Sequence, residues 1–242
     1  MLVPTMARAT VTTRLGSGTV CPGSEVDILV SVSDTMRNVG AISLVFNYDN
    51  TKLGYAGYAD VIPAINNNVL VNASGGKVYI SWYSTNPIVI GDTLLCVRFQ
   101  GLNSGNCSLT WDTQNCEYAN TMGNIIESNY QNGSATVYAQ PAINSHPGNV
   151  STTAGNNVSF QVSASGQSIA YQWQRKAAGT SDWVNLTNTS TYSNVTSYRM
   201  TVNNVTQQMS GDQFRCVVSG TCTPEVYSNA ATLLVGHTTI VT

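Results

Sequence analysis

The chain has 242 residues, a formal net charge of −2 and only 9% Asp, Glu, Lys and Arg, against about 25% in an average soluble protein. The small net charge and the lack of a basic run argue against nucleic acid or an anionic membrane surface as a partner. No apolar stretch reaches the length of a transmembrane helix. The length favours two domains, each with its own core.

Alternation of apolar and polar residues predicts the strands of the first part of the chain. Residues 26–32 alternate in this way and residues 41–49 do so again, as expected for strands with one buried face. Two such strands cannot bury their apolar faces alone, so a second sheet must cover them. Further strands are expected at 9–13, 53–58, 69–71, 78–83, 93–100, 107–112 and 134–138, with a long polar loop over 115–129 and a hairpin turn at Asn132-Gly133.

A second all-β pattern begins after a short segment that contains Pro141. Residues 139–142 are expected to form a stiff linker, because proline restricts the backbone. Beyond it, residues 143–242 show short alternating runs separated by turn residues, followed by a C-terminal tail. Regular spacing of such runs is typical of a β-sandwich. The sequence therefore predicts an all-β protein with domains at 1–138 and 143–242.

Motifs in a fixed order carry a resemblance for the first domain. They are Cys21-Pro22-Gly23, Val39-Gly40-Ala41-Ile42, Ile80-x-Trp82, Gly91-Asp92-x-Leu94 and Gly133-Ser134-x-Thr136-Val137. With these motifs residues 7–138 resemble a cohesin-like module, which implies a nine-stranded jelly-roll sandwich. Cohesins bind dockerins, but the resemblance does not by itself assign that role here.

The resemblance also implies where a partner would bind. In cohesins the sheet that holds the third and sixth strands carries the partner-binding face. The matching outward positions in this chain are Ser43, Val45, Asn47, Tyr79, Ser81 and Tyr83. Tyrosines among small residues suit a contact patch. The alternative is an ordinary solvated sheet face.

The second domain resembles the bacterial immunoglobulin-like domains. Trp173 and the run Asp212-x-Phe214-x-Cys216 carry this resemblance over residues 143–236. Phe214 stands where that family usually has tyrosine. Val162 stands where antibody-type domains have their second-strand cysteine, so Cys216 lacks its usual partner.

Six cysteines without a CxxC motif favour disulfides in a secreted protein over a zinc site. Cys216 and Cys222 flank a turn and, given Val162, are expected to pair. The other four are expected to pair as Cys21–Cys116 and Cys96–Cys107. The pairing of Cys96 with Cys107 has a difficulty, because Cys107 shares the parity of the inward residues on its strand and Cys96 does not.

No catalytic residue, enzyme activity or cofactor is expected. The two histidines, His146 and His237, lie in contexts without a nucleophile or an acid partner. One candidate for a calcium site is the set of oxygen-bearing residues Asp112, Asn115, Glu117 and Asn120. Its spacing is not that of an EF-hand, and a plain polar loop is the alternative. Trp82, Trp111 and Trp173 share parity with core residues and are expected inside.

Three functions agree with these features. The first is a non-catalytic adhesive or structural module of an extracellular bacterial protein, which contacts a protein or a surface glycan. The second is a subunit of a self-assembling filament or surface layer. The third is an ancillary binding segment of a secreted carbohydrate-active enzyme. All three place the chain outside the cell and exclude nucleic acid and membrane insertion.

Overall fold

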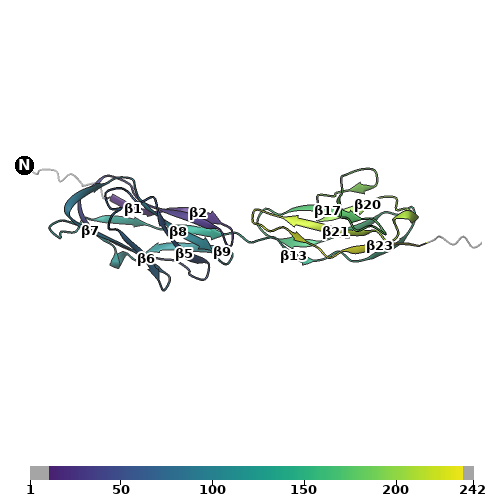
Figure 1. The fold of residues 1–242 in the computed structure, drawn as a ribbon, viewed down its shortest axis with the longest axis horizontal. Coiled ribbons are helices and arrows are strands. Elements are labelled where there is room, and N and C mark those ends of the chain that lie inside the picture. Colours follow the sequence, from purple (N-terminus) through teal and green to yellow (C-terminus); the bar gives the residue numbers. More distant parts are fainter. Residues whose placement is uncertain (1–10, 237–242) are drawn as a thin grey trace, which may run out of the picture. The chain divides into compact units, whose positions relative to one another are not determined.

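The computed structural model describes residues 11–236, and their regular secondary structure is almost entirely β-strand (Figure 1). The chain divides into two compact units, Met1–Tyr138 (unit 1) and Ala139–Thr242 (unit 2). The predicted all-β fold class is confirmed. No helix within residues 11–236 is long and apolar enough to cross a membrane.

Between residues 11 and 138, unit 1 has twelve strands and one short 3-10 helix, η1 (Thr113–Asn115). The strands are β1 (Val11–Leu15), β2 (Ser17–Val20), β3 (Glu25–Val32), β4 (Met36–Asn47), β5 (Leu53–Ala59), β6 (Leu70–Ser74), β7 (Lys77–Ile90), β8 (Thr93–Gly101), β9 (Gly105–Trp111), β10 (Glu117–Asn120), β11 (Ser128–Gln131) and β12 (Gly133–Val137).

Two sheets face each other in unit 1. One has the order β11-β1-β3-β8-β5, and the other has the order β2-β12-β9-β4-β7-β6, with β10 also paired to β4. The inward side chains of both sheets form one core. Phe46 of β4 joins the sheets, because its ring lies 6.3 Å from that of Phe99 on β8 and 5.6 Å from that of Trp111 on β9, both edge to face. Trp82 and Trp111 are buried, as predicted.

The segment predicted as a long loop over 115–129 differs from the structure. It contains β10 and the start of β11. The alternation rule missed β10 because Tyr118 and Ala119 are adjacent and both buried. The predicted hairpin turn at Asn132-Gly133 is also wrong, since β11 and β12 belong to different sheets. Gly133 is needed for another reason: a Cβ there would lie 2.1 Å from the Gly16 carbonyl oxygen.

Unit 2 is a smaller β-sandwich with its own core. One sheet has the order β14-β23-β21-β17-β18 with β22 paired to β21, and opposite it lies the sheet β15-β20-β19, with a two-stranded sheet β13-β16. A short 3-10 helix, η2 (Gln207–Met209), precedes β21. The strands are β13 (Ala142–Ser145), β14 (Val150–Thr153), β15 (Val158–Gln161), β16 (Ser163–Ser165), β17 (Ala170–Lys176), β18 (Val184–Asn185), β19 (Tyr192–Ser193), β20 (Arg199–Val202), β21 (Gln213–Ser219), β22 (Val226–Tyr227) and β23 (Ala231–Gly236).

The core of unit 2 forms around three aromatic rings. Phe160 of β15 stacks on Phe214 of β21 with 4.8 Å between ring centroids, and it also contacts Trp173 of β17. Trp173 is fully buried, as predicted. Ala142, at the end of the predicted linker, already belongs to β13 and pairs with Ser165.

The three predicted disulfide pairings are wrong. Cys96, Cys107, Cys116 and Cys216 are free thiols, whereas Cys21 and Cys222 are disulfide-bonded. Side-chain direction explains two of these errors, those at Cys216 and at Cys96–Cys107. Cys216 points into the core of unit 2 and is fully buried opposite Trp173, so it cannot reach the turn that follows β21. Cys107 is buried between the sheets, whereas Cys96 alternates with the buried Leu95 and Val97 and lies on the other side of its strand.

Candidate functional site: the outer face of unit 1

The candidate contact face is the outer side of the sheet formed by β10, β4, β7 and β6. Register places outward residues of these strands in rows across the sheet. The rows are Ala119–Ala41–Tyr83, Glu117–Ser43–Ser81–Leu70, Val45–Tyr79–Asn72 and Asn47–Lys77–Ser74. We call this surface the unit 1 face. The sequence placed Tyr79, Tyr83, Ser43 and Ser81 on one side of the sheet, and register brings them together there.

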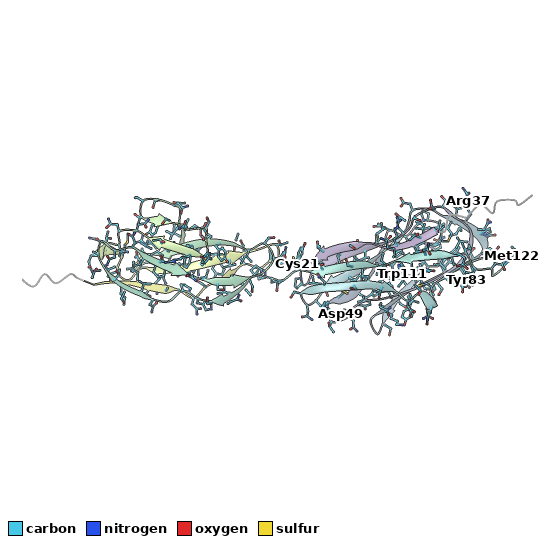
Figure 2. All side chains as sticks on the ribbon, turned by 180° about the vertical axis from the view of Figure 1, so that it is seen from behind. Cys21, Arg37, Asp49, Tyr83, Trp111 and Met122 are labelled. Carbon is cyan, nitrogen blue, oxygen red and sulfur yellow. The ribbon has the colours of Figure 1, made fainter. Side chains whose placement is uncertain are left out.

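Large apolar side chains are exposed on this face. Tyr83 is 76% exposed, Leu70 69% and Tyr79 40%. Tyr83 lies beside Ala41 in its row, so no large neighbour covers the ring. Met122, on the connection after β10, is 79% exposed, and it lies toward the same end of unit 1 as Tyr83 in Figure 2. Burying such side chains against a partner is a source of binding free energy.

Asn68 supports the strand from which Tyr83 projects. Its side-chain oxygen accepts a hydrogen bond of 2.7 Å from the indole nitrogen of Trp82, and its amide nitrogen donates one of 3.0 Å to the Tyr83 carbonyl oxygen. One side chain thus satisfies a mostly buried indole donor and fixes the backbone at Tyr83. Trp82 faces the core and Tyr83 the solvent, as period-two alternation requires.

Val45 was predicted as part of the contact surface, and the structure corrects this. Its side chain faces the outer side but is only 7% exposed. The segment from Asp112 to Glu117 covers it: the backbone nitrogen of Asp112 and the Cys116 thiol both donate to the Val45 carbonyl oxygen, at 2.8 and 3.2 Å. Asn47 is partly buried and donates to the Thr110 carbonyl oxygen.

The covering segment forms one wall of a groove. The groove has a volume of about 640 Å³, and Ser43, Val45 and Tyr79 lie on one side of it. Lys77, Asp112 and Glu117 also line it. The Lys77 ammonium donates a hydrogen bond of 2.9 Å to Asp112. That bond lowers the pKa of the Asp112 carboxyl below its usual range and raises that of Lys77. The positive charge of Lys77 is balanced by Asp112 in this ion pair. Glu117 therefore gives the groove one negative charge without a partner among the described residues.

The four calcium candidates do not form one cluster. Asp112, Asn115 and Glu117 line this groove, but Asn120 lines a separate cavity of about 540 Å³ beside Arg37 and Glu127. The Asn120 side-chain oxygen already accepts two backbone N–H groups, from Met122 and Asn124. Among the residues that the structure describes, no three His, Cys, Asp or Glu side chains gather as a metal site would require. A calcium site here stays a prediction.

Sequence reasoning missed Leu70, Met122 and the supporting role of Asn68. Leu70 lies in the strand expected at 69–71, but that strand was not assigned to the contact face. Its position opposite Ser81 could have been found by pairing the two strands across the Gly75-Gly76 turn. Met122 lies in the stretch read as a plain loop, and no pattern in the sequence marks it as exposed.

Comparison with known protein families identifies the part of the chain that carries this face. Residues 11–137, more than half of the chain, match the family model described as the cohesin domain. The chain belongs to the cohesin family. Cohesin domains are non-catalytic protein-binding modules, so the expectation of no enzyme activity is confirmed. A search of the curated proteins found no match.

Solved structures that are similar to part of this chain include several cohesins. The cohesin CaCohA2 from Clostridium acetobutylicum is 26% identical with a TM-score of 0.46, and the match covers 53% of this chain and 90% of that one. A non-cellulosomal cohesin from the archaeon Archaeoglobus fulgidus is 23% identical, with a TM-score of 0.45 and coverages of 53% and 91%. The third cohesin of ScaC from Acetivibrio cellulolyticus, solved in complex with the ScaB dockerin, is 14% identical, with a TM-score of 0.49 and coverages of 53% and 99%.

Proposed function

We propose that this chain is an extracellular contact module whose unit 1 face binds a protein partner of the dockerin class. The observation that carries the proposal is the exposure of Tyr83, Leu70 and Tyr79 together on one sheet face. Membership of the cohesin family supports the class of partner. Aromatic residues are over-represented among the residues that dominate protein interfaces, and small neighbours leave Tyr83 open to a partner.

The extracellular location is part of the same proposal. The structure contains disulfide-bonded cysteines, Cys21 and Cys222. Disulfides persist in oxidising compartments and are rare in the cytosol of mesophiles. The low content of charged residues and the nearly all-β architecture agree with a secreted or surface-attached bacterial protein.

We infer further that unit 2 is an immunoglobulin-like domain that spaces or displays unit 1. Three features support this: two facing sheets, Trp173 buried on β17, and Phe214 and Cys216 both inward on β21 opposite it. The parallel pairing of β14 with β23 adds a strand at the sheet edge. A filament or surface-layer subunit is the competing function, and it would use the same exposed face for self-association.

The experiment measures binding of the full chain to a panel of dockerin modules by calorimetry, together with its self-association by sedimentation. A Tyr79→Ala/Tyr83→Ala double variant should weaken dockerin binding by at least about tenfold, as expected for two contact residues of an interface. Tyr58→Ala is the matched control, because Tyr58 is 42% exposed on the opposite sheet.

Three outcomes contradict the proposal in different ways. Equal binding by the wild-type chain and the double variant would exclude the face. A panel without any binder would exclude the partner class. Concentration-dependent self-association that the double variant abolishes would favour the filament subunit instead. Thermal unfolding of every variant must match that of the wild type for these conclusions to hold.

A further inference from the structure

Unit 2 carries a stacked arrangement of cations and aromatic rings on the outer face of its larger sheet. The Arg215 guanidinium lies 4.3 Å from the ring centroid of Trp183 and 4.6 Å from that of Tyr227. The Lys176 ammonium lies 5.3 Å from the Trp183 centroid. We call Trp183, Arg215, Tyr227 and Lys176 the unit 2 platform. Cation–π contacts of this kind hold a cation in a defined place.

Strand register explains why these side chains meet. Phe214 and Cys216 of β21 point into the core, so Arg215 between them points outward. Arg215 pairs with Gln174 on β17, which in turn pairs with Asn185 on β18. Trp183 directly precedes β18, and Tyr227 lies on β22 next to β21. The platform therefore extends from β22 over β21 and β17 to the residue before β18.

The hydrogen bonds of Arg215 leave its outer edge open. Its Nε donates a bond of 2.7 Å to the Gln174 side-chain oxygen, and the Gln174 amide nitrogen donates one of 2.8 Å to Asn185. The Nη groups form no hydrogen bond within residues 11–236. Because the rings of Trp183 and Tyr227 lie against the guanidinium, its N–H groups remain available to a ligand only in the guanidinium plane. A guanidinium held in this way suits a planar carboxylate, which it can bind with two parallel hydrogen bonds.

The two cations of the platform have no direct acidic partner within the described residues, although one carboxylate lies near them. Within the described part of the chain neither Lys176 nor Arg215 forms an ion pair, whereas Arg175, one residue before Lys176, is paired with Asp212. The nearby Glu225 carboxylate accepts a hydrogen bond from the Tyr227 hydroxyl. Because neither cation forms an ion pair within the described residues, both can contact an anionic ligand.

The surroundings distinguish a sugar from a protein as the source of that anion. The outward residues around the platform are Gln172, Gln213, Thr232 and Asn185. These side chains are uncharged hydrogen-bonding groups suited to sugar hydroxyls, and the half-exposed Tyr227 ring offers an apolar surface for a sugar ring. Within the described residues, this face exposes two large apolar side chains, Tyr227 at 47% and Leu234 at 50%, and they lie on separate strands, β22 and β23. They do not form the continuous apolar centre that is typical of a protein interface.

We propose that the unit 2 platform binds an acidic polysaccharide, with Arg215 on the carboxylate of one sugar residue and Tyr227 against a ring of the chain. This activity is separate from the proposed protein contact of unit 1. It gives the chain a second ligand of different chemistry, and it would let one molecule contact an acidic glycan surface and a protein partner.

The test uses the full chain and oligogalacturonate as the probe, with fully methyl-esterified oligogalacturonate as its neutral counterpart. Calorimetry at low salt should detect binding of the acid form and not of the ester. Arg215→Gln should weaken binding by about tenfold or more, because a charge-assisted bidentate contact is lost. Arg215→Lys should also weaken it, since a point charge cannot replace the planar fork.

Arg199→Gln is the matched control, because Arg199 is an exposed cation of unit 2 on β20, in the opposite sheet. Its affinity should stay within about twofold of the wild type, a change too small to indicate a lost contact. If Arg215→Gln alters folding, Tyr227→Ala provides a second test, because Tyr227 is half exposed and its loss should also weaken binding of oligogalacturonate. The proposal is overturned if the ester binds equally, if poly-glutamate binds as tightly as the oligogalacturonate, or if none of the platform variants changes the affinity. Failure here leaves the unit 1 proposal intact, because that test uses other residues and another ligand.

Discussion

The unit 1 face and the unit 2 platform are both outer sides of sheets, yet their chemistry is opposite. On unit 1 the cation Lys77 is paired with Asp112, and the exposed area is apolar, at Tyr83, Leu70 and Tyr79. On unit 2 the cations Lys176 and Arg215 rest on aromatic rings, without an acidic partner in the described residues.

The difference shows how neighbours decide what an outward aromatic residue can do. Tyr83 lies beside alanine and stays open, so its ring is free to be buried by a partner. Trp183 lies beside two cations and is partly covered by them, so its ring holds charges in place. The same alternation rule brings both residues to a sheet surface, and only the cross-strand partners separate a protein-binding face from a charged one.

The largest effect should come from the residue beneath the unit 1 face. Trp82→Ala is expected to destabilise unit 1 by about 3–5 kcal/mol, as a large-to-small core change that also leaves Asn68 without its indole donor. Tyr83→Ala, one residue along the same strand, should change the free energy of unfolding by less than about 0.5 kcal/mol. Urea denaturation of the two variants checks this. Similar losses for both would mean that β7 does not separate a core side from a contact side.

In unit 2, the ion pair of Arg175 with Asp212 should contribute more to stability than the stacking of Arg215 on aromatic rings. Asp212 is buried and accepts hydrogen bonds from Arg175 Nε at 2.7 Å and from the Ala178 backbone nitrogen at 2.9 Å. Asp212→Ala should cost about 3 kcal/mol, the lower end for breaking a buried pair, because Arg175 keeps contact with water. Arg215→Gln should cost less than about 1 kcal/mol in stability, as for an exposed site. Chemical denaturation of both variants tests the contrast, and a larger loss for Arg215→Gln would assign the platform a purely structural role.

Much of the fold could be predicted from the sequence because its strands alternate clearly. The buried positions of Trp82, Trp111 and Trp173 follow from parity alone. The errors lie where a side chain departs from that pattern. Tyr118 and Ala119 are adjacent and both buried, so β10 was read as loop, and Val45 faces outward but is covered by a segment distant in sequence.

The sites were harder to predict than the fold because they depend on cross-strand neighbours. Tyr79 and Tyr83 could be placed on a face by counting residues along one strand. Leu70 and the platform around Arg215 require the register between strands, which alternation does not supply. The cysteine pairings failed for a related reason: spacing along the chain suggests proximity, but the direction of each Cβ decides whether two sulfur atoms can meet.

Unit 1 has a buried hydrogen bond between two neutral side chains, Thr13 and Tyr118, whereas the Arg175–Asp212 pair of unit 2 is ionic. Removing the neutral hydrogen bond is therefore expected to cost less stability. The Tyr118 hydroxyl lies 3.1 Å from Thr13 Oγ1, which donates to it, and burial raises the pKa of Tyr118 well above its usual value. Tyr118→Phe should cost about 1 kcal/mol, since Thr13 keeps a second partner in Ser128. Tyr130→Phe, whose hydroxyl forms no hydrogen bond within the described residues, should be near neutral. Denaturation curves for Tyr118→Phe and Tyr130→Phe show whether the hydrogen bond to Thr13 contributes to stability beyond the packing of the tyrosine ring.

The smallest expected effect concerns the exposed ion pair after β4 and its dependence on pH. The Asp49 carboxylate accepts hydrogen bonds from Lys52 Nζ and Thr51 Oγ1, both at 2.6 Å, and from the Thr51 backbone nitrogen at 3.0 Å. These bonds, that from Lys52 first, lower the pKa of Asp49 from 3.8 to about 2. A depressed carboxyl pKa stabilises the fold fully above the unfolded value and loses that contribution as the pH falls through the folded value.

The stability lost in Asp49→Asn should therefore be constant above pH 4 and shrink as the pH falls toward 2. The loss should also fall in concentrated salt, because the pair is exposed and screened. Denaturation at a series of acidic pH values measures both trends. Lys52→Gln provides a check from the other partner: its loss should shrink in the same pH range, because protonated Asp49 no longer attracts the ammonium group. A loss for Asp49→Asn that stayed constant down to pH 2 would show that the carboxylate contributes only through its turn geometry, which asparagine can reproduce in part.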